Sequence, residues 1–300
     1  MLQVHNISKR FGGFQALDGL TMYVPDGAIY GFIGKNGAGK TTLIKIVGGL
    51  LHADNGEITR GGGRGAGESV SAHPRLGMIA GAPAMYADMT AEENMKQQYR
   101  LLGLSTFDDI GEKLARVGLA HTGRKKARHF SLGMRQRMGL AMALSGDPDF
   151  VILDEPMGGL DPQGMHEFRE LIRRLNAEQG VTFLISSHLL GELSRVATHF
   201  GFIDRGSMLK QLTAEELERS LQKSVRMRVS DADALTAILD GMAARYRRLS
   251  GMEVEVLSPV SITHVAVELM QKNCELYACT ETEESLENYF MQLVGSEQHA

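Results

Sequence analysis

The sequence predicts an α/β protein with a mostly parallel sheet, followed by a small unit of mixed helices and strands. Apolar segments of strand length alternate with segments of helical character, which is typical of a parallel sheet with helices on both faces. One of these strands runs into a glycine-rich turn that leads directly into a helix. The character changes near Leu212, after which short helices and strands carry no recognisable site chemistry. We therefore expect two domains, residues 1–211 and residues 212–300.

Composition and charge limit the class of protein. Of the 300 residues, 43% are hydrophobic and 23% are charged, which is the balance of a soluble globular protein with a sizeable core. The net charge of −4 disfavours a nucleic-acid binder that depends on bulk positive charge. The two cysteines, Cys274 and Cys279, are too few for a disulfide-based secreted scaffold.

The sequence offers no candidate for a secretory or membrane-spanning segment. The N-terminus lacks the apolar stretch of a secretory signal. No stretch reaches the roughly 18 apolar residues that a spanning helix needs. We therefore expect the protein on the cytoplasmic side of any membrane with which it associates.

We expect the first domain to begin with short strands, followed by a helix. Short strands are expected within Leu2–Tyr30, and Ala28–Ile33 is an apolar run of strand length. Thr41–Leu51 has helical character. Arg60–Gly67 is rich in glycine, but no apolar strand leads into it, so we expect a surface loop there.

The remainder of the first domain continues the alternation. Thr90 and Glu93 fit a capping box and predict the start of a helix. Gly123–His129 holds four Lys or Arg residues; we expect a solvated loop, with attraction of a polyphosphate as the alternative. The other predicted elements are the strands Leu76–Ala80, Phe150–Leu153 and Thr182–Ile185 and the helices Leu132–Leu144 and His166–Leu175.

The second domain has an α+β pattern. A capping sequence at Thr213 predicts its first helix. The other predicted elements are the strands Val225–Val229, Glu253–Leu257 and Leu276–Thr280 and the helices Ala234–Tyr246, Ile262–Gln271 and Glu284–Val294.

A phosphate-binding loop is the strongest motif in the chain. Gly34–Thr41 matches the pattern Gly-x4-Gly-Lys-Thr in full, with a strand before it and a helix after it. Glycines let the backbone wrap closely around phosphate oxygens, and the helix adds its positive N-terminal end. Lys40 is expected to reach the β- and γ-phosphates of ATP, and the Thr41 hydroxyl to ligate Mg²⁺. The predicted nucleotide-binding residues of this region are Asn36, Gly37, Ala38, Gly39, Lys40, Thr41 and Thr42.

Polar residues follow two further apolar strands. Asp154 and Glu155 end the strand that begins at Phe150, at the sheet edge where ligands bind in α/β proteins. Asp154 is the candidate partner of Mg²⁺, and Glu155 is the candidate base for the attacking water. His188 follows the strand Thr182–Ile185, where it could contact a γ-phosphate or hold a water.

A third motif separates this chain from phosphate-loop proteins in general. Phe130–Arg137 resembles the signature sequence of ATP-binding cassette (ABC) ATPases, usually Leu-Ser-Gly-Gly-Gln-x-Gln-Arg. Its form here, Ser-Leu-Gly-Met-x-Gln-Arg, is similar to the bacterial subgroup that includes bacitracin- and lantibiotic-resistance exporters. The matching residues are Ser131, Gly133, Gln136 and Arg137, whereas Phe130, Leu132 and Met134 depart from the usual form.

Other family elements occur in the same order, so that the resemblance covers about Leu2–Lys210. Phe11 stands where an aromatic residue stacks on adenine, and Gly159–Pro162, with Asp161, resembles the D-loop. His188 corresponds to the switch histidine. The resemblance implies a P-loop NTPase fold of the ABC-ATPase type. Such a fold has a mostly parallel sheet core, an antiparallel β subdomain and a helical subdomain, here with a small C-terminal α+β appendage.

The resemblance also implies a mechanism and partners. Two cassettes of this family sandwich two ATP molecules, so Ser131 and the backbone of Gly133 would bind the γ-phosphate held by a partner subunit. We therefore expect a dimer, with a homodimer as the first expectation and a related chain as the alternative. The implied role is an ATPase at the cytoplasmic face of the membrane, bound peripherally to a separately encoded permease. The expected cargo is an exported peptide antibiotic, lipid or drug-like molecule, and no nucleic acid partner is expected.

One departure and two other readings stay open. The family usually has Gln, and this subgroup often Glu, where this chain has Gly81, so a backbone carbonyl or water would have to serve Mg²⁺ there, or hydrolysis and coupling would differ. The segment Ala82–Met95 follows the position at which the family docks its permease. Its apolar side chains, Met85, Tyr86 and Met89, fit such a docking surface, and packing into the core is the alternative. The alternatives are a soluble ABC ATPase acting on ribosomes or nucleic acid, and a nucleotide-dependent regulator with little turnover.

Overall fold

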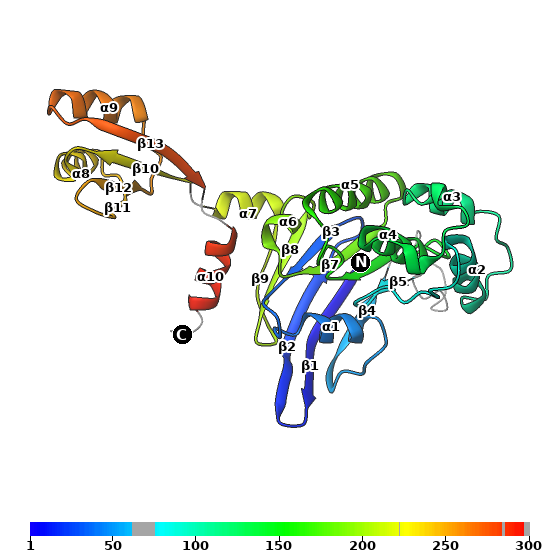
Figure 1. Ribbon diagram of the computed structural model, residues 1–300. Coiled ribbons are helices and arrows are strands. Elements are labelled where there is room, and N and C mark those ends of the chain that lie inside the picture. Colours follow the sequence, from blue (N-terminus) through cyan, green and yellow to red (C-terminus); the bar gives the residue numbers. More distant parts are fainter. Residues whose placement is uncertain (62–75, 222, 284–285, 297–300) are drawn as a thin grey trace. The chain divides into compact units, whose positions relative to one another are not determined.

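The computed structural model describes residues 1–61, 76–221, 223–283 and 286–296. The chain forms two compact units, Met1–Ala214 and Glu215–Ala300, and each is described by itself (Figure 1). Of the glycine-rich segment expected as a surface loop, the part from residue 62 onward lies outside the described residues.

A six-stranded sheet forms the centre of the N-terminal unit. Five neighbouring strands, in the spatial order β5, β6, β7, β3 and β8, pair in parallel. The edge strand β9 pairs antiparallel with β8. Every residue of β3, β6 and β7 is buried, as expected for parallel strands covered on both faces. The order across the sheet is β5 (Leu76–Ile79), β6 (Phe150–Asp154), β7 (Thr182–Ser187), β3 (Ile29–Ile33), β8 (His199–Asp204) and β9 (Ser207–Thr213).

A second, antiparallel sheet shares a core with one face of the first. Its order is β2 (Phe14–Val24), β1 (Leu2–Phe11) and β4 (Asn55–Arg60). The helix α1 (Lys40–Val47) packs into the same core through Leu43 and Ile44. This shared core fixes the position of α1, and with it the loop that precedes α1.

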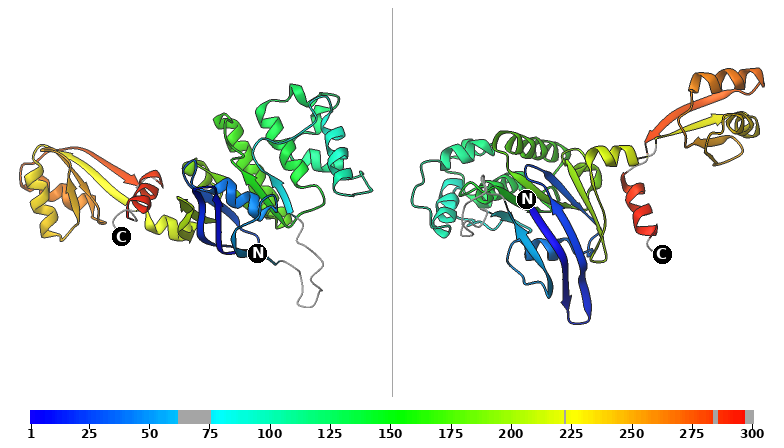
Figure 2. Two further views of the ribbon diagram at one scale, coloured as in Figure 1. Left: turned by 90° about the horizontal axis from the view of Figure 1, so that it is seen from below. Right: turned by 180° about the vertical axis from the view of Figure 1, so that it is seen from behind.

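The remaining helices of this unit form two groups. In Figure 1, α5 (Pro162–Gln179) and α6 (Leu190–Leu193) cover the face of the sheet opposite α1. A helical subdomain, cyan to green in Figure 2, contains α2 (Ala91–Leu101), α3 (Ile110–Arg116) and α4 (Leu132–Ala143). The predicted capping box of α2 is present, since the Thr90 hydroxyl accepts from the Glu93 backbone N–H and the Glu93 carboxylate accepts from the Thr90 N–H. The mixed sheet, antiparallel subdomain and helical subdomain confirm the predicted fold class.

The C-terminal unit pairs a four-stranded antiparallel sheet with two helices on a common core. The sheet order is β11 (Tyr246–Arg248), β12 (Glu253–Val256), β10 (Lys223–Val229) and β13 (Leu276–Glu283). The core residues include Met227, Leu235, Leu239, Val254, Val265 and Leu269. The helices of this part of the chain are α7 (Ala214–Ser220), α8 (Ala232–Gly241), α9 (Ile262–Gln271) and α10 (Leu286–Ser296).

The helix predicted over Ala234–Tyr246 was wrong at its C-terminal end. The helix α8 stops at Gly241, and Ala243 adopts a left-handed backbone conformation with φ 51°. Tyr246 instead belongs to β11, where it pairs with Val256. Pairing with a distant strand therefore decided the conformation of residues that local pattern had assigned to a helix.

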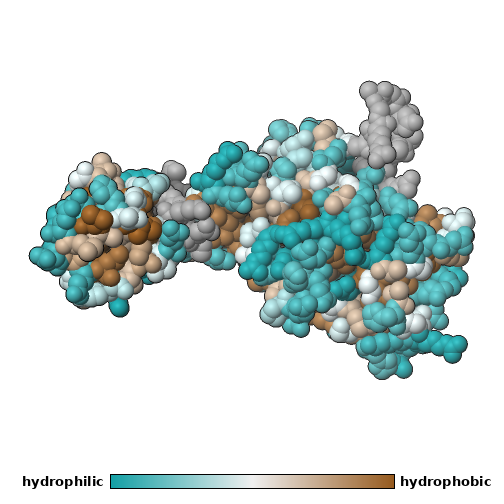
Figure 3. All heavy atoms as spheres, turned by 90° about the horizontal axis from the view of Figure 1, so that it is seen from above, coloured by the Kyte–Doolittle hydropathy of each residue, from teal (hydrophilic) through white to brown (hydrophobic). Residues whose placement is uncertain are grey.

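In the described part of the chain, no helix is long and apolar enough to cross a membrane. Figure 3 shows polar residues over much of the face of the N-terminal unit turned toward the viewer, with small apolar patches between them.

Candidate active site

The phosphate loop lies between the end of β3 and the start of α1. Gly39 precedes α1 with φ 111°, and a Cβ atom there would lie 2.7 Å from the carbonyl oxygen of Ala16. Only glycine fits at this position without displacing backbone. No side chain caps the N-terminus of α1, and its first turn contains no acidic residue. The positive end of the helix is therefore open to an anion such as a phosphate group.

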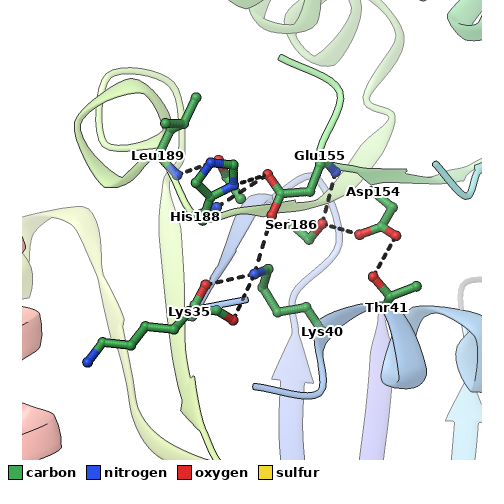
Figure 4. A network of polar contacts seen from close by, with 10 residues as sticks. Lys35, Lys40, Thr41, Asp154, Glu155, Ser186, His188 and Leu189 are labelled. Carbon is green, nitrogen blue, oxygen red and sulfur yellow. Dashed lines mark hydrogen bonds and ion pairs between the residues drawn. The ribbon is translucent and has the colours of Figure 1, made fainter. Parts of the chain in front are cut away.

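Lys40 is buried, with 6% of its surface exposed, and its ammonium lies within the loop. Its Nζ donates to the carbonyl oxygens of Gly34 at 2.7 Å and Lys35 at 3.3 Å (Figure 4). The same Nζ lies 3.3 Å from Oε1 of Glu155. The cation is thus held where a phosphate entering the loop would meet it.

Asp154, the last residue of β6, has both carboxylate oxygens hydrogen-bonded. Oδ2 accepts from the Thr41 hydroxyl at 2.9 Å, and Oδ1 accepts from the Ser186 hydroxyl at 2.5 Å. A hydroxyl and a carboxylate are the hard oxygen ligands that Mg²⁺ prefers, and this ion commonly takes one or two protein ligands plus phosphates and waters. No group of three His, Cys, Asp or Glu among the described residues offers a metal cage. Thr41 and Asp154 therefore fit Mg²⁺ bound together with a nucleotide.

Glu155 has a strained backbone and a carboxylate between two basic side chains. Its φ of 51° is left-handed, a conformation that costs a non-glycine residue about 1–2 kcal/mol. Oε1 faces Lys40, and Oε2 lies 2.8 Å from Nδ1 of His188 and accepts from the His188 backbone N–H at 3.3 Å. The structure thus brings together five residues that the sequence singled out: Lys40, Thr41, Asp154, Glu155 and His188.

Ser186 is a contact residue that the sequence analysis missed. It is fully buried at the carboxyl end of β7, and Figure 4 shows its hydroxyl beside Asp154 and the backbone of Glu155. The available signal was a polar residue that ends an apolar strand at the edge where Asp154 also lies.

The residues of the signature and the D-loop gather around a different cavity, of about 620 Å³. Ser131 caps α4 by accepting from the Met134 N–H at 3.3 Å, and Asp161 caps α5 by accepting from the Gly164 N–H at 2.8 Å. A close approach joins the two segments, since a Cβ at Gly159, whose φ is 76°, would lie 3.1 Å from the Leu132 side chain. The cavity lining includes Ser131, Leu132, Gly133, Gly159, Leu160 and Asp161.

Phe11 lies at the end of the β1–β2 hairpin, where it pairs with Phe14. Both side chains are largely exposed, at 48% and 61%. The Lys9 ammonium lies 5.7 Å from the centroid of the Phe11 ring. Phe14, which the sequence analysis did not select, is thus a second exposed aromatic residue at the same position.

Gly81 lies just beyond β5, at the sheet edge that also carries Asp154. It is exposed, has φ 82°, and a Cβ built on it would meet no atom within 4 Å. Among the described residues, no neighbouring atom occupies the place of a side chain here, but the left-handed backbone itself favours glycine.

The segment after Gly81 is fixed by a buried amide. The Asn94 side chain, 1% exposed, accepts from the Tyr86 N–H at 2.7 Å and donates to the Tyr86 and Thr90 carbonyl oxygens. Tyr86 is 55% exposed. The basic segment expected as a solvated loop packs beside it, since Arg128 pairs with Asp88 at 2.6 Å.

Comparison with known proteins identifies relatives. A family model described as ABC transporter matches residues 17–158. The chain is 33% identical over 302 residues to the bacitracin transport ATP-binding protein BcrA of Bacillus licheniformis, covering 98% of this chain and 97% of that protein. It is 38% identical over 209 residues to the lantibiotic transport ATP-binding protein SrtF of Streptococcus pyogenes, covering 70% of this chain and 89% of that protein.

The fold is also found among solved structures. A dimeric ATP-binding cassette in a post-hydrolysis state, bound to ADP and Pi, aligns with a TM-score of 0.61 and 20% identity. That alignment covers 71% of this chain and 99% of the other. The comparisons confirm the resemblance that the motifs predicted.

Proposed function

The chain belongs to the ATP-binding subunits of the ABC transporter family, and we propose that it powers a separate permease that exports a peptide antibiotic, a lipid or another drug-like substrate. One observation carries the proposal: a bacitracin transport ATP-binding protein matches 98% of this chain. That match extends through the C-terminal unit, whereas the family model ends at residue 158. The similarity to a lantibiotic transport protein supports the same class of cargo.

The chain's own residues have distinct roles in ATP hydrolysis. The loop Asn36–Thr42 and the N-terminus of α1 hold the phosphates, and the Lys40 ammonium binds the β- and γ-phosphates in place of its present carbonyl partners. Thr41 and Asp154 would hold Mg²⁺, which when bound neutralises charge on the phosphate oxygens. Phe11 stacks on the adenine from the exposed end of its hairpin.

Glu155 and His188 act on the water and on the γ-phosphate. The Glu155 carboxylate orients the attacking water and accepts its proton, and the contacts of its two oxygens with Lys40 and His188 set the direction of the carboxylate. His188 positions Glu155 and contacts the γ-phosphate from the end of β7. Both residues belong to the same chain as Lys40 and the phosphate loop.

The signature residues act on a second subunit. Ser131, Gly133 and Asp161 surround an open cavity at two helix N-termini, which suits a phosphate presented by another chain. A homodimer provides two such sites. The solved dimeric cassette bound to ADP and Pi supports this arrangement through its shared fold.

The membrane partner docks on the segment that follows Gly81. Tyr86 is exposed there, and Asn94 holds its backbone in place. The subunit would thus lie at the cytoplasmic face of the membrane, bound through the permease and not through a span of its own.

Affinity purification of the full chain from detergent-solubilised native membranes tests the proposal. A polytopic membrane protein recovered in a fixed ratio to this chain is the expected result, with its recovery lost in a Tyr86→Asp variant. Glu92→Gln is the matched control, since it removes an exposed charge on the same helix, paired with Lys96 in the next turn, and leaves the cap at Thr90 intact.

Recovery from the soluble fraction with ribosomal proteins or DNA would overturn the transporter role. In the transporter case, a deletion strain should lose resistance to peptide antibiotics, and the wild type but not Glu155→Gln should restore that resistance, which would identify the cargo class.

A further inference from the structure

The hydroxyl of Ser186 contacts both acidic residues of the site. It donates to Oδ1 of Asp154 at 2.5 Å, and it accepts from the backbone N–H of Glu155 at 3.0 Å. The Ser186 carbonyl oxygen accepts from the same N–H at 3.2 Å. One residue of β7 therefore holds a side chain at the end of β6 and the strained backbone that follows it.

Sheet geometry explains why this hydroxyl reaches the acids. Asp154 and Ser186 are paired residues of parallel neighbouring strands, so their side chains point to the same face of the sheet. The next residue, Ser187, is also buried, but its side chain points to the other face, where its hydroxyl accepts from the Leu189 N–H at 2.9 Å. The side chains of these two adjacent buried serines thus lie on opposite faces of the sheet and have different hydrogen-bond partners.

We propose that Ser186 is a positioning residue that fixes the Asp154 carboxylate and the Glu155 backbone relative to each other. This inference rests on the ATPase function proposed above. With the Thr41 hydroxyl on Oδ2 and the Ser186 hydroxyl on Oδ1, the carboxylate of Asp154 cannot rotate without losing a hydrogen bond. With its N–H held twice by Ser186, Glu155 keeps a φ of 51° and directs its carboxylate toward Lys40 and His188.

Removal of the hydroxyl has a specific consequence. Ser186 is fully buried and Asp154 is 5% exposed, so water has no ready access to replace the lost donor. Asp154 would keep only its bond to Thr41 and become free to turn, while the phosphate loop itself is untouched. Mutation of a residue that hydrogen-bonds to a metal-binding carboxylate typically lowers metal affinity or activity about 10- to 100-fold.

The experiment compares full-length wild type with Ser186→Ala, Ser186→Thr and the matched control Ser187→Ala. Binding of a fluorescent ATP analogue is measured with EDTA and across a Mg²⁺ titration, and steady-state ATP hydrolysis is measured across the same titration. We expect Ser186→Ala to bind the analogue normally in EDTA. Its half-saturating Mg²⁺ concentration should rise about 10-fold or more, and its turnover should fall to a similar extent. Ser186→Thr restores the hydroxyl and should restore the Mg²⁺ dependence, and Ser187→Ala should not change it.

Wild-type Mg²⁺ dependence in Ser186→Ala, or an equal change in Ser187→Ala, would overturn the inference and leave the proposed ATPase function standing. Absence of ATP hydrolysis by the full-length wild type would instead count against the proposed function. If Ser186→Ala does not fold, Ser186→Cys replaces it, since a thiol fills the position of the hydroxyl but is a weak donor. Identical Mg²⁺ titrations for the Cys and Thr variants would then refute the positioning role.

Discussion

Two regions of the N-terminal unit carry residues expected to contact nucleotide, and they use their polar groups differently. In the phosphate-loop region, Lys40 and Glu155 pair with each other, and Asp154 accepts from two hydroxyls. In the described part of the signature region, the side chains of Ser131 and Asp161 instead cap their own helices beside an open cavity.

This difference indicates which region serves ATP binding and which serves ATP hydrolysis. The phosphate-loop region has its cation, carboxylates and helix end assembled within one chain, so one chain should suffice to bind ATP. The signature region presents two helix N-termini to a phosphate that a second chain would hold. Hydrolysis should therefore depend on both regions, whereas binding by a single chain should depend on the first alone.

The largest effect that would separate binding from hydrolysis is expected at Glu155. Glu155→Gln removes the base but keeps the shape, so turnover should fall about 10²- to 10⁴-fold while ATP binding persists. The ATP-bound dimer should accumulate, which light scattering after gel filtration measures. Glu178→Gln, an exposed carboxylate near the C-terminal end of α5, is the control. Normal turnover by Glu155→Gln would remove this residue from the role of base.

A mixing experiment tests directly whether the two regions act between chains. Lys40→Met should lose ATP affinity or turnover about 100-fold or more, because a buried phosphate-binding cation is lost. Ser131→Ala should keep ATP binding and lose turnover. Random pairing makes about half of the dimers mixed, each with one intact composite site, so hydrolysis should return to up to about a quarter of the wild-type rate per dimer.

The control for this mixture is Lys45→Met, an exposed lysine on the same helix as Lys40. Failure of the mixture to recover activity, when both variants dimerise, would contradict action between chains.

A smaller effect is expected at the adenine. Phe11→Ala should weaken ATP binding about 10-fold, since stacking of a base on an aromatic side chain is worth about 1–3 kcal/mol. Phe14→Ala is the matched variant on the paired strand. Isothermal titration with ATP and with inorganic triphosphate distinguishes the cases, because only ATP binding should respond. A larger loss in Phe14→Ala would transfer the stacking role to that residue.

The smallest effect concerns stability and leaves both regions intact. Thr90→Ala removes the cap of α2 and should lower the free energy of unfolding by about 1 kcal/mol. The hydrogen bond from the Thr90 N–H, aided by Lys126, holds the pKa of Glu93 below its ordinary 4.5. A lowered carboxyl pKa stabilises the fold above pH 4.5, and this contribution is lost as the pH falls through the folded-state value.

Thermal unfolding of the wild type and Glu93→Gln should therefore differ at pH 7 and converge as the pH falls through the lowered pKa of Glu93. Glu92→Gln is the control, since Glu92 pairs only with exposed Lys96 in the next turn. A difference that persists at low pH would contradict the assignment to the Glu93 carboxylate.

Much of the site could be predicted because its signals are local. The loop from Gly34 to Thr41 is one continuous motif, and Asp154 and Glu155 directly follow a run of apolar residues. Helix starts could also be predicted, as at Thr90, because a capping residue and its partner lie only three residues apart.

The contacts between segments could not be read in the same way. Ser186 lies 32 residues after Asp154, and nothing in either segment specifies that β7 pairs with β6 in the register that joins them. The left-handed backbone of Glu155 and the strand position of Tyr246 likewise depend on partners distant in sequence.

The sequence by itself determined which residues can bind phosphate, hold a metal and accept a proton, because these properties belong to side chains and short motifs. Only the tertiary structure decided how they meet. Strand order and register bring the carboxyl ends of β3, β6 and β7 together, and the burial of Asp154 and Ser186 makes the hydrogen bond between them hard for water to replace.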